Sequence, residues 1–296
     1  MPVPFGFLCL DKPLLDTSHD LVYQVRRGTR IKRIGHAGTL DPLATGVLVL
    51  AIGAATRLIE YVMASQKTYL ATIRLGQQTP SYDAETQVIA TAEIHHLTER
   101  DIQAALKHFE GEVEQIPPMH SAVWHNGQRL YDLARRGEVV EREARRVWMQ
   151  PRLISYHPPD AHIEVICSPG TYIRTLAHDL GQVLGVGAYL AALRRTASGG
   201  FTDPVAWADF HNAMEEGTWA RYLRSEREAL PEMPEIHLDA DQTFTHVHGN
   251  SVSVPACLAE DQVCRVYAAD GRFIAVSRFC DGRLLPQKVF PPEVDA

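Results

Sequence analysis

The 296-residue sequence has only five cysteines, and no two of them form a CxxC pair. Such an odd, scattered set favours free thiols in a reducing compartment over disulfides or a zinc site. Long hydrophobic runs are also missing: the longest, VLVLAIGAA, is too short to span a bilayer. The N-terminus lacks the charged-then-apolar pattern of a signal peptide. These absences predict a cytoplasmic protein with neither a metal site nor a membrane partner.

Signatures of several common enzyme classes are absent as well. There is no HxE with PCxxC and no HExxH for zinc hydrolysis, and no GxSxG for a serine hydrolase. The glycine patterns that bind nucleotide phosphates are missing too. The fourteen histidines are scattered, and a lone histidine is more often structural than catalytic. What remains is a well-placed aspartate with arginines and aromatic residues near turns, a set suited to work on a sugar–base bond.

The net charge of −7 at first argues against a nucleic-acid partner, but the charge is uneven. Residues 1–200 carry about +1 and residues 201–296 about −8. Each basic cluster is either a solvated face or a set of phosphate contacts. We favour local phosphate contacts for the clusters, which are Arg26, Arg27, Arg30, Lys32 and Arg33; Arg129, Arg135 and Arg136 with Arg142, Arg145 and Arg146; and Arg194 with Arg195.

Periodicity and turn signals predict an α+β protein with a large mixed or antiparallel sheet, because strands and helices alternate without a regular βαβ pattern. The expected strands are 5–13, 47–52, 67–76, 146–157 and 161–170. The expected helices are 17 or 18 onward, 56–62, 98–109 and 171–185.

The length predicts two domains, which we place at residues 1–230 and 235–296. Prolines and dense arginines indicate an RNA-contacting insert at about 112–146. The acidic stretch Glu215 to Pro234 is typical of a linker. Beyond it, short strands joined by DG turns indicate a small β-barrel.

One aspartate occupies an unusual place. In GHAGTLDPLATGVLVLAIGAATR, Asp41 lies in a turn of small residues that runs into a very apolar segment. Asp41 could cap a short helix that begins at Pro42, since a carboxylate accepts the free amide protons of a first turn. Alternatively, it is a nucleophile or general base on a rigid loop backed by a buried strand. This stretch leaves both open.

Six sequence blocks, in this order, resemble the TruB family of bacterial tRNA pseudouridine synthases: GFLCLDKP…TS, GHAGTLDPLATGVL, KTYLATIRLG, SAVWHNGQRLYDLARRGEVVER, CSPGTYIRTLAHDLG and GAYLAALRRTASGGF. The resemblance implies isomerisation of uridine 55 in the T-loop of tRNA, with no cofactor and no guide RNA. It also implies a pseudouridine synthase catalytic domain followed by a PUA-like module, and we expect a monomer.

The resemblance also implies roles for individual residues. Asp41 matches the catalytic aspartate, Tyr69 the active-site tyrosine that stacks on uracil, and Arg174 the arginine that pairs with the carboxylate. His36 matches a histidine that enters the opened T-loop. Four further residues are expected at the substrate: Tyr172, Leu193, Lys12 and Asp83.

The chain departs from the family pattern at several places. Leu15 stands where glycine is usual, His120 replaces a usual tyrosine, and Trp124 and His125 precede the NG of the insert where a lysine is common. The loop TPSYDAET differs from the usual TDTGDAEG but retains Asp83 in register. A different class also stays open, namely a non-catalytic folding factor that binds the tRNA T-arm. A third is a guide-dependent enzyme, which the RLYDLARRG insert disfavours.

Overall fold

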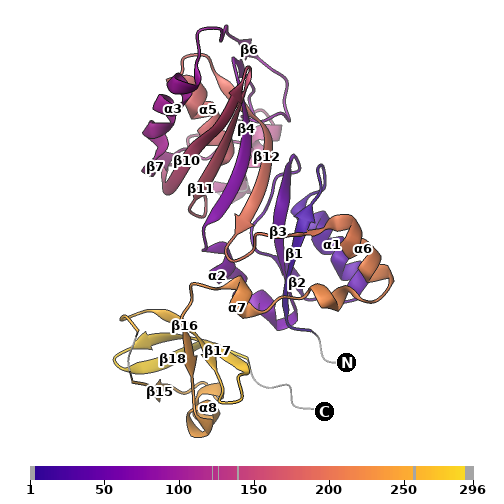
Figure 1. Cartoon of the computed structure of the whole chain (residues 1–296), viewed down its shortest axis with the longest axis vertical. Helices are drawn as coiled ribbons and strands as arrows, with labels where there is room; N and C mark the ends of the chain where they lie inside the picture. Colours follow the sequence, from indigo (N-terminus) through magenta and orange to yellow (C-terminus); the bar gives the residue numbers. More distant parts are fainter. Residues whose placement is uncertain (1–3, 122, 126, 139, 256–257, 291–296) are drawn as a thin grey trace.

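The computed structural model describes residues 4–290 except 122, 126, 139 and 256–257, without the side chains of 125, 129, 131, 134 and 135. A nine-stranded sheet runs through the first two thirds of the chain in the order β13-β1-β3-β12-β4-β11-β10-β7, with β2 also paired to β3 (Figure 1). Its strands are β1 (Gly6–Lys12), β2 (Ile34–His36), β3 (Ala44–Ile52), β4 (Lys67–Leu75), β7 (Gly111–Gln115), β10 (Arg145–His157), β11 (Asp160–Cys167), β12 (Ala188–Ser198) and β13 (Val205–Ala206).

The pairing confirms the predicted α+β class with a mixed sheet. Only β1 with β13 and β3 with β12 are parallel, and the other pairs of this sheet are antiparallel. The strands expected at 146–157 and 161–170 are present as the antiparallel pair β10 and β11. The continuous apolar run of β3 follows from burial on both faces, since alternate residues enter two different cores.

Helices cover both halves of the sheet, and each half has its own hydrophobic core (Figure 1). Helices α1 (Ser18–Thr29) and α6 (Trp207–Glu215) pack beside β1 and β3, whereas α3 (Glu99–Leu106) and α5 (Ile173–Val183) pack over β4, β10, β11 and β12. Helix α1 begins at Ser18, where the sequence predicted a helix start, and Thr17 caps it with a capping box. The shorter helices are η1 (Gly53–Leu58), α2 (Ile59–Met63), η2 (Lys107–Phe109), α4 (Leu130–Arg135), η3 (Trp219–Tyr222) and α7 (Glu226–Ala229).

One close approach of two strands depends on glycine. Gly46 on β3 lies opposite Arg195 on β12 with a φ of +98°, and a Cβ there would lie 2.2 Å from the Arg195 carbonyl oxygen. We expect Gly46→Ala to lower the free energy of unfolding by about 2–4 kcal/mol, because the backbones must separate. Gly217→Ala is the control: φ is +74° there but the space is open, so about 1 kcal/mol is expected. If urea titrations show that Gly46→Ala and Gly217→Ala lower the free energy of unfolding equally, the clash at Gly46 is contradicted.

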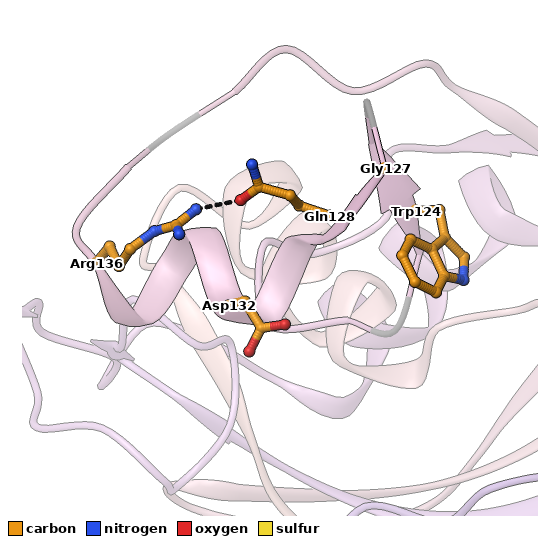
Figure 2. Close-up of a pocket in the computed structure, with 5 residues that line it drawn as sticks. All are labelled: Trp124, Gly127, Gln128, Asp132 and Arg136. Carbon is orange, nitrogen blue, oxygen red and sulfur yellow. Dashed lines mark hydrogen bonds between the residues drawn. The ribbon is translucent and has the colours of Figure 1, made fainter.

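The insert is shorter than predicted. Residues 111–115 and 145–149 pair with each other as β7 and β10 of the main sheet, so the excursion comprises 116–144 rather than about 112–146. The short strands β8 (Trp124–His125) and β9 (Gln128–Arg129) precede α4. Figure 2 shows Trp124, Gln128, Asp132 and Arg136 around a surface pocket, with Arg136 hydrogen-bonded to Gln128. Strands β5 (Gln77–Gln78) and β6 (Ala90–Thr91) form a separate small hairpin.

The predicted linker at 215–234 is wrong, because this stretch is packed against the first domain. The backbone of Arg224 exchanges two hydrogen bonds with Phe7 of β1, and Leu230 is buried in the same core. Its charges serve this packing: Arg224 pairs with Asp203 at 2.8 Å, and Ser225 and Glu228 form the capping box of α7. Composition alone therefore misrepresented a folded segment.

A second sheet follows in the order β14-β16-β17-β18-β15, with α8 (Ala240–Val247) beside it (Figure 1). It comprises β14 (Glu235–His237), β15 (Val252–Ser253), β16 (Val263–Tyr267), β17 (Phe273–Cys280) and β18 (Arg283–Val289). Gly271 and Gly282 lie in the predicted DG turns. This five-stranded sheet is compatible with a PUA-like module. Phe5 and Phe290 join it to the first domain, with ring centroids 5.7 Å apart.

Candidate active site

Asp41 lies in a tight turn immediately before β3. Its carbonyl oxygen accepts a hydrogen bond from the Ala44 amide at 3.0 Å, and the strand begins at Ala44. No helix starts at Pro42, so the interpretation of Asp41 as a helix cap is wrong. The Asp41 side chain is therefore available for other contacts.

One arginine connects two carboxylates at this turn. Arg174, in the first turn of α5, places Nε 3.1 Å from Asp41 Oδ2 and donates from Nη2 to Asp41 Oδ1 at 3.3 Å. Its Nη1 lies 3.5 Å from Asp83 Oδ2. The guanidinium fork thus fixes the orientation of the Asp41 carboxylate. This geometry agrees with the expected pairing of Arg174 with Asp41 and adds Asp83 as a second partner.

The electrostatics of Asp41 combine opposing effects. Burial raises the pKa of its carboxyl above the ordinary 3.8, the Arg174 guanidinium opposes this rise, and the Asp83 charge adds to it. Even so, 43% of the Asp41 side-chain surface is exposed, against 7% for Arg174. Protein atoms therefore surround much of the Asp41 side chain, yet the side chain remains accessible from outside.

A shallow recess opens beside this carboxylate. Asp41, Asp83 and Arg174 form its polar part, and Leu43, Ala44 and residues 190–193 form its apolar wall. Leu193, expected at the substrate, is thus in place through the pairing of β12 with β3 and β4. An apolar wall beside a few converging charged groups suits a ligand that has an apolar face and polar edges.

Tyr69 and His36 lie outside the lining of this recess. Tyr69 is half-buried on β4 opposite Val165, and burial raises the pKa of its hydroxyl, with the Asp41 charge adding to the rise. His36 ends β2, and its Nδ1 is a buried atom without a hydrogen-bond partner among the described residues. Burial lowers the pKa of His36, so the neutral ring is favoured.

Lys12 does not take the place that the resemblance implied. Its side chain is fully buried, and its ammonium donates to the carbonyl oxygens of Pro13, Asp16 and Pro42 at 2.8, 2.6 and 3.4 Å. Because the ammonium is enclosed in backbone oxygens, the prediction of direct substrate contact is wrong for Lys12. It instead joins the loop after β1 to the turn that carries Asp41.

Two residues, Gln115 and Arg195, hold this region together in a way that the sequence did not indicate. The Gln115 side-chain amide accepts from the Tyr172 N–H at 3.0 Å and donates to the Tyr172 carbonyl at 3.2 Å, which fixes the entry to α5. Arg195 is buried and donates to the carbonyls of Val47 and Gly38 at 2.7 and 3.2 Å. A lone glutamine or arginine in a strand gives no signal of such a role.

The basic clusters differ in their surroundings. The five basic side chains at 26–33 are exposed, and none of them forms an ion pair with an acid in the described part of the chain. Arg136 is exposed and paired with Glu138 at 2.8 Å, whereas the side chains of Arg129 and Arg135 lie outside the described residues. Arg194 and Arg195 are not a surface cluster, since Arg194 pairs with Asp11 at 2.7 Å and Arg195 is buried.

Comparison with known proteins places this arrangement in a family. The profile described as TruB family pseudouridylate synthase (N terminal domain) matches residues 26–173. Profiles for the tRNA pseudouridylate synthase B C-terminal domain and for the C-terminal part of pseudouridine synthase II TruB match 174–226 and 234–290. The chain belongs to the TruB family. The TruB profiles therefore extend over all the residues that build the recess.

Individual TruB relatives agree over nearly the whole chain. The tRNA pseudouridine synthase B of Dehalococcoides mccartyi strain BAV1 is 41% identical over 98% of this chain and 99% of its own length. That of Pseudomonas paraeruginosa is 40% identical, over 96% and 95%. The crystal structure of a Cbf5–Nop10–Gar1 complex superposes with a TM-score of 0.78 at 25% identity, over 97% of this chain and 85% of that one. As a TruB protein, this chain is a pseudouridine synthase, that is, an isomerase.

Two further observations complete the description. No helix in the described ranges is both long and apolar enough to cross a membrane. The described cysteines, at positions 9, 167, 264 and 280, are free thiols as the sequence predicted, and Cys257 lies outside the described residues.

Proposed function

We propose that this TruB protein converts uridine 55 in the T-loop of tRNA to pseudouridine. The observation that carries the proposal is the exposed Asp41 carboxylate, held by Arg174 beside a recess with an apolar wall. Relatives about 40% identical over nearly the full chain are named tRNA pseudouridine synthase B, which supports tRNA as the substrate.

Asp41 and Arg174 have separate roles, which follow from their surroundings. Asp41 acts as the nucleophile on the target nucleotide while the bond between N1 of uracil and C1′ of ribose breaks, and the bond that Asp41 forms breaks again when the base rejoins the ribose. Arg174 orients the carboxylate and favours its charged form. The detached uracil turns against the apolar wall and rejoins C1′ through C5, so that N1 gains a proton and the C5 hydrogen leaves to solvent. No group is gained or lost overall, because the base both leaves and returns.

The remaining expected site residues contact the substrate RNA. Tyr69 stacks on the uracil and takes part in removing the C5 proton, Tyr172 and Leu193 bound the uridine pocket, and His36 fills the space that the flipped bases leave. A neutral His36 ring suits that last role, since its insertion does not require a charge to be desolvated.

The test uses a tRNA transcript with tritium at C5 of its uridines, given to the purified protein without guide RNA. We expect tritium release and a pseudouridine at position 55, and a transcript with cytidine at 55 should release none. Release only after addition of a guide RNA would point to the guide-dependent class instead. Tight binding without release would favour the non-catalytic T-arm folding factor.

The exposed basic cluster at 26–33 yields a separate prediction. Replacing Arg27 and Arg30 together by alanine should make the plot of log Kobs for T-arm binding against log salt concentration less steep by about 1.4–1.8, because two phosphate contacts are lost. Arg152→Ala is the control, since Arg152 pairs with Glu164 at 3.0 Å on the sheet face opposite Tyr69. Equal slopes for the double variant and the control would contradict phosphate binding by this cluster.

A further inference from the structure

A ring stack lies between the loop of residues 79–86 and helix α5, which carry Asp83 and Arg174 of the recess. The centroids of the Tyr82 and His178 rings are 3.9 Å apart, and the ring planes are inclined by 16°. Tyr82 directly precedes Asp83, and His178 lies one turn beyond Arg174 on α5. Residues four apart share one helix face. The adjacent residues Tyr82 and Asp83 therefore contact the neighbouring helix residues His178 and Arg174.

The ring stack is needed to fix the position of the loop relative to α5. Asp83 is already fixed within the loop, since its Oδ1 accepts from the Ser81 hydroxyl at 2.6 Å and from the Glu85 amide at 3.0 Å. Its other oxygen faces Arg174 at 3.5 Å. These internal bonds orient the carboxylate relative to the loop but not relative to α5. Outside contacts must supply that second constraint.

Tyr82, which is adjacent to Asp83, makes two contacts outside the loop. The Leu190 amide on β12 donates to the Tyr82 carbonyl at 2.9 Å, which ties the loop to the apolar wall of the recess. The ring stack ties the same residue to α5. Tyr82 thus joins the wall of the recess to the helix that carries Arg174.

The backbone of Tyr82 adds a second, independent observation. Its φ of +63° lies in the left-handed region, which residues with a side chain rarely adopt and glycine adopts readily. The chain therefore tolerates an unfavourable conformation in order to place a ring here, and the stack offsets that strain.

We infer that Tyr82 and His178 form a positioning pair that holds Asp83 against Arg174 and thereby sets the orientation of the Arg174 guanidinium on Asp41. Neither residue touches the recess, and both act through the Asp83–Arg174 contact. The inference deepens the proposed function and rests on it for its kinetic consequences.

The test compares Tyr82→Gly, which suits the left-handed backbone but lacks the ring, with Tyr82→Phe, which keeps the ring. In the tritium-release assay, we expect kcat of Tyr82→Gly to fall about 10- to 100-fold with KM within about twofold of wild type, because the site is misaligned while RNA binding is unchanged. Tyr82→Phe should retain wild-type kcat. His178→Ala, which leaves the loop sequence intact, should reproduce the loss. Wild-type kcat in Tyr82→Gly, or equal losses in the Gly and Phe variants, would overturn the inference.

A second readout does not require activity. The groups that face the Asp41 carboxyl are Arg174, Asp83 and Lys12, and the Asp83 charge raises the Asp41 pKa. If the stack positions Asp83, a carboxyl ¹³C NMR titration should show a lower Asp41 pKa in Tyr82→Gly than in wild type and no change in Tyr82→Phe. An unchanged Asp41 pKa in Tyr82→Gly would overturn the positioning role. Absence of tritium release by wild type would instead reject the proposed function, so the two failures are distinguishable.

Discussion

Asp41→Asn is expected to lower the rate of tritium release by about 10⁴-fold or more, the scale of loss when an enzyme loses its nucleophile. The amide has nearly the shape of the carboxylate but cannot attack the nucleotide as an anion. It also leaves the Arg174 guanidinium, 3.1 Å from the present Oδ2, without its negative partner. The measurement is single-turnover tritium release, at saturating protein, from an RNA hairpin that has the T-arm sequence and tritium at C5 of its uridines.

The control for Asp41→Asn is binding of the same hairpin. Because the basic cluster at 26–33 is untouched, the dissociation constant should stay within about threefold of wild type, which is less than 1 kcal/mol. Release by Asp41→Asn at a rate near that of wild type would exclude Asp41 as the nucleophile. Loss of both binding and release would instead show that the turn at 41–44 had lost its structure.

The sequence predicted the elements that carry the site because their signals are local. The helix start at 17–18, the strands on either side of 158–159 and helix α5 all follow from the spacing of apolar residues and caps. Short or charged segments were misjudged: β7, with two glutamates in five residues, was assigned to the insert, and α7 was assigned to a linker. In these segments, tertiary pairing outweighs composition.

Within the site, residue identity was predictable but surroundings were not. The TruB motifs indicated Asp41 and Arg174, and the structure brings these two together across 133 positions of sequence. No local pattern could show that the Lys12 ammonium is enclosed by backbone oxygens or that the Gln115 amide fixes Tyr172. Such facts depend on which chain segments meet in space, and local sequence patterns do not show this.

Arg174→Ala is expected to have the second large effect, on stability as well as on activity. Arg174 and Asp83 are 7% and 8% exposed, so removal of the guanidinium leaves a buried carboxylate uncompensated. Breaking a buried pair from one side costs about 3–5 kcal/mol, and we expect about 3 kcal/mol from urea unfolding at pH 8 because Asp41 retains access to solvent. Tritium release should fall at least about 10³-fold, since the Asp41 carboxylate loses its orientation.

The stability deficit of Arg174→Ala should depend on pH in a definite direction. Burial and Asp83 already raise the Asp41 pKa above 3.8, and removal of the opposing Arg174 charge raises it further. A raised pKa in the folded state stabilises the fold below the unfolded-state pKa, and this stabilisation is lost as the pH rises through the folded-state pKa. The deficit should therefore be smaller at pH 5 than at pH 8. A deficit independent of pH would contradict a charge effect of Arg174 on Asp41.

Two comparisons separate this charge effect from lost packing. Arg152→Ala removes an exposed partner of Glu164 and should cost no more than about 0.5 kcal/mol at either pH. Adding Asp83→Asn to Arg174→Ala removes the uncompensated buried charge, so part of the stability should return although a second native contact is lost. Recovery of stability without recovery of tritium release would mean that Arg174 is needed for two separable reasons, to compensate Asp83 and to orient Asp41. A further loss in the double variant would instead mean that Asp83 stabilises the loop of residues 79–86 through Ser81 and Glu85 more than its charge destabilises it.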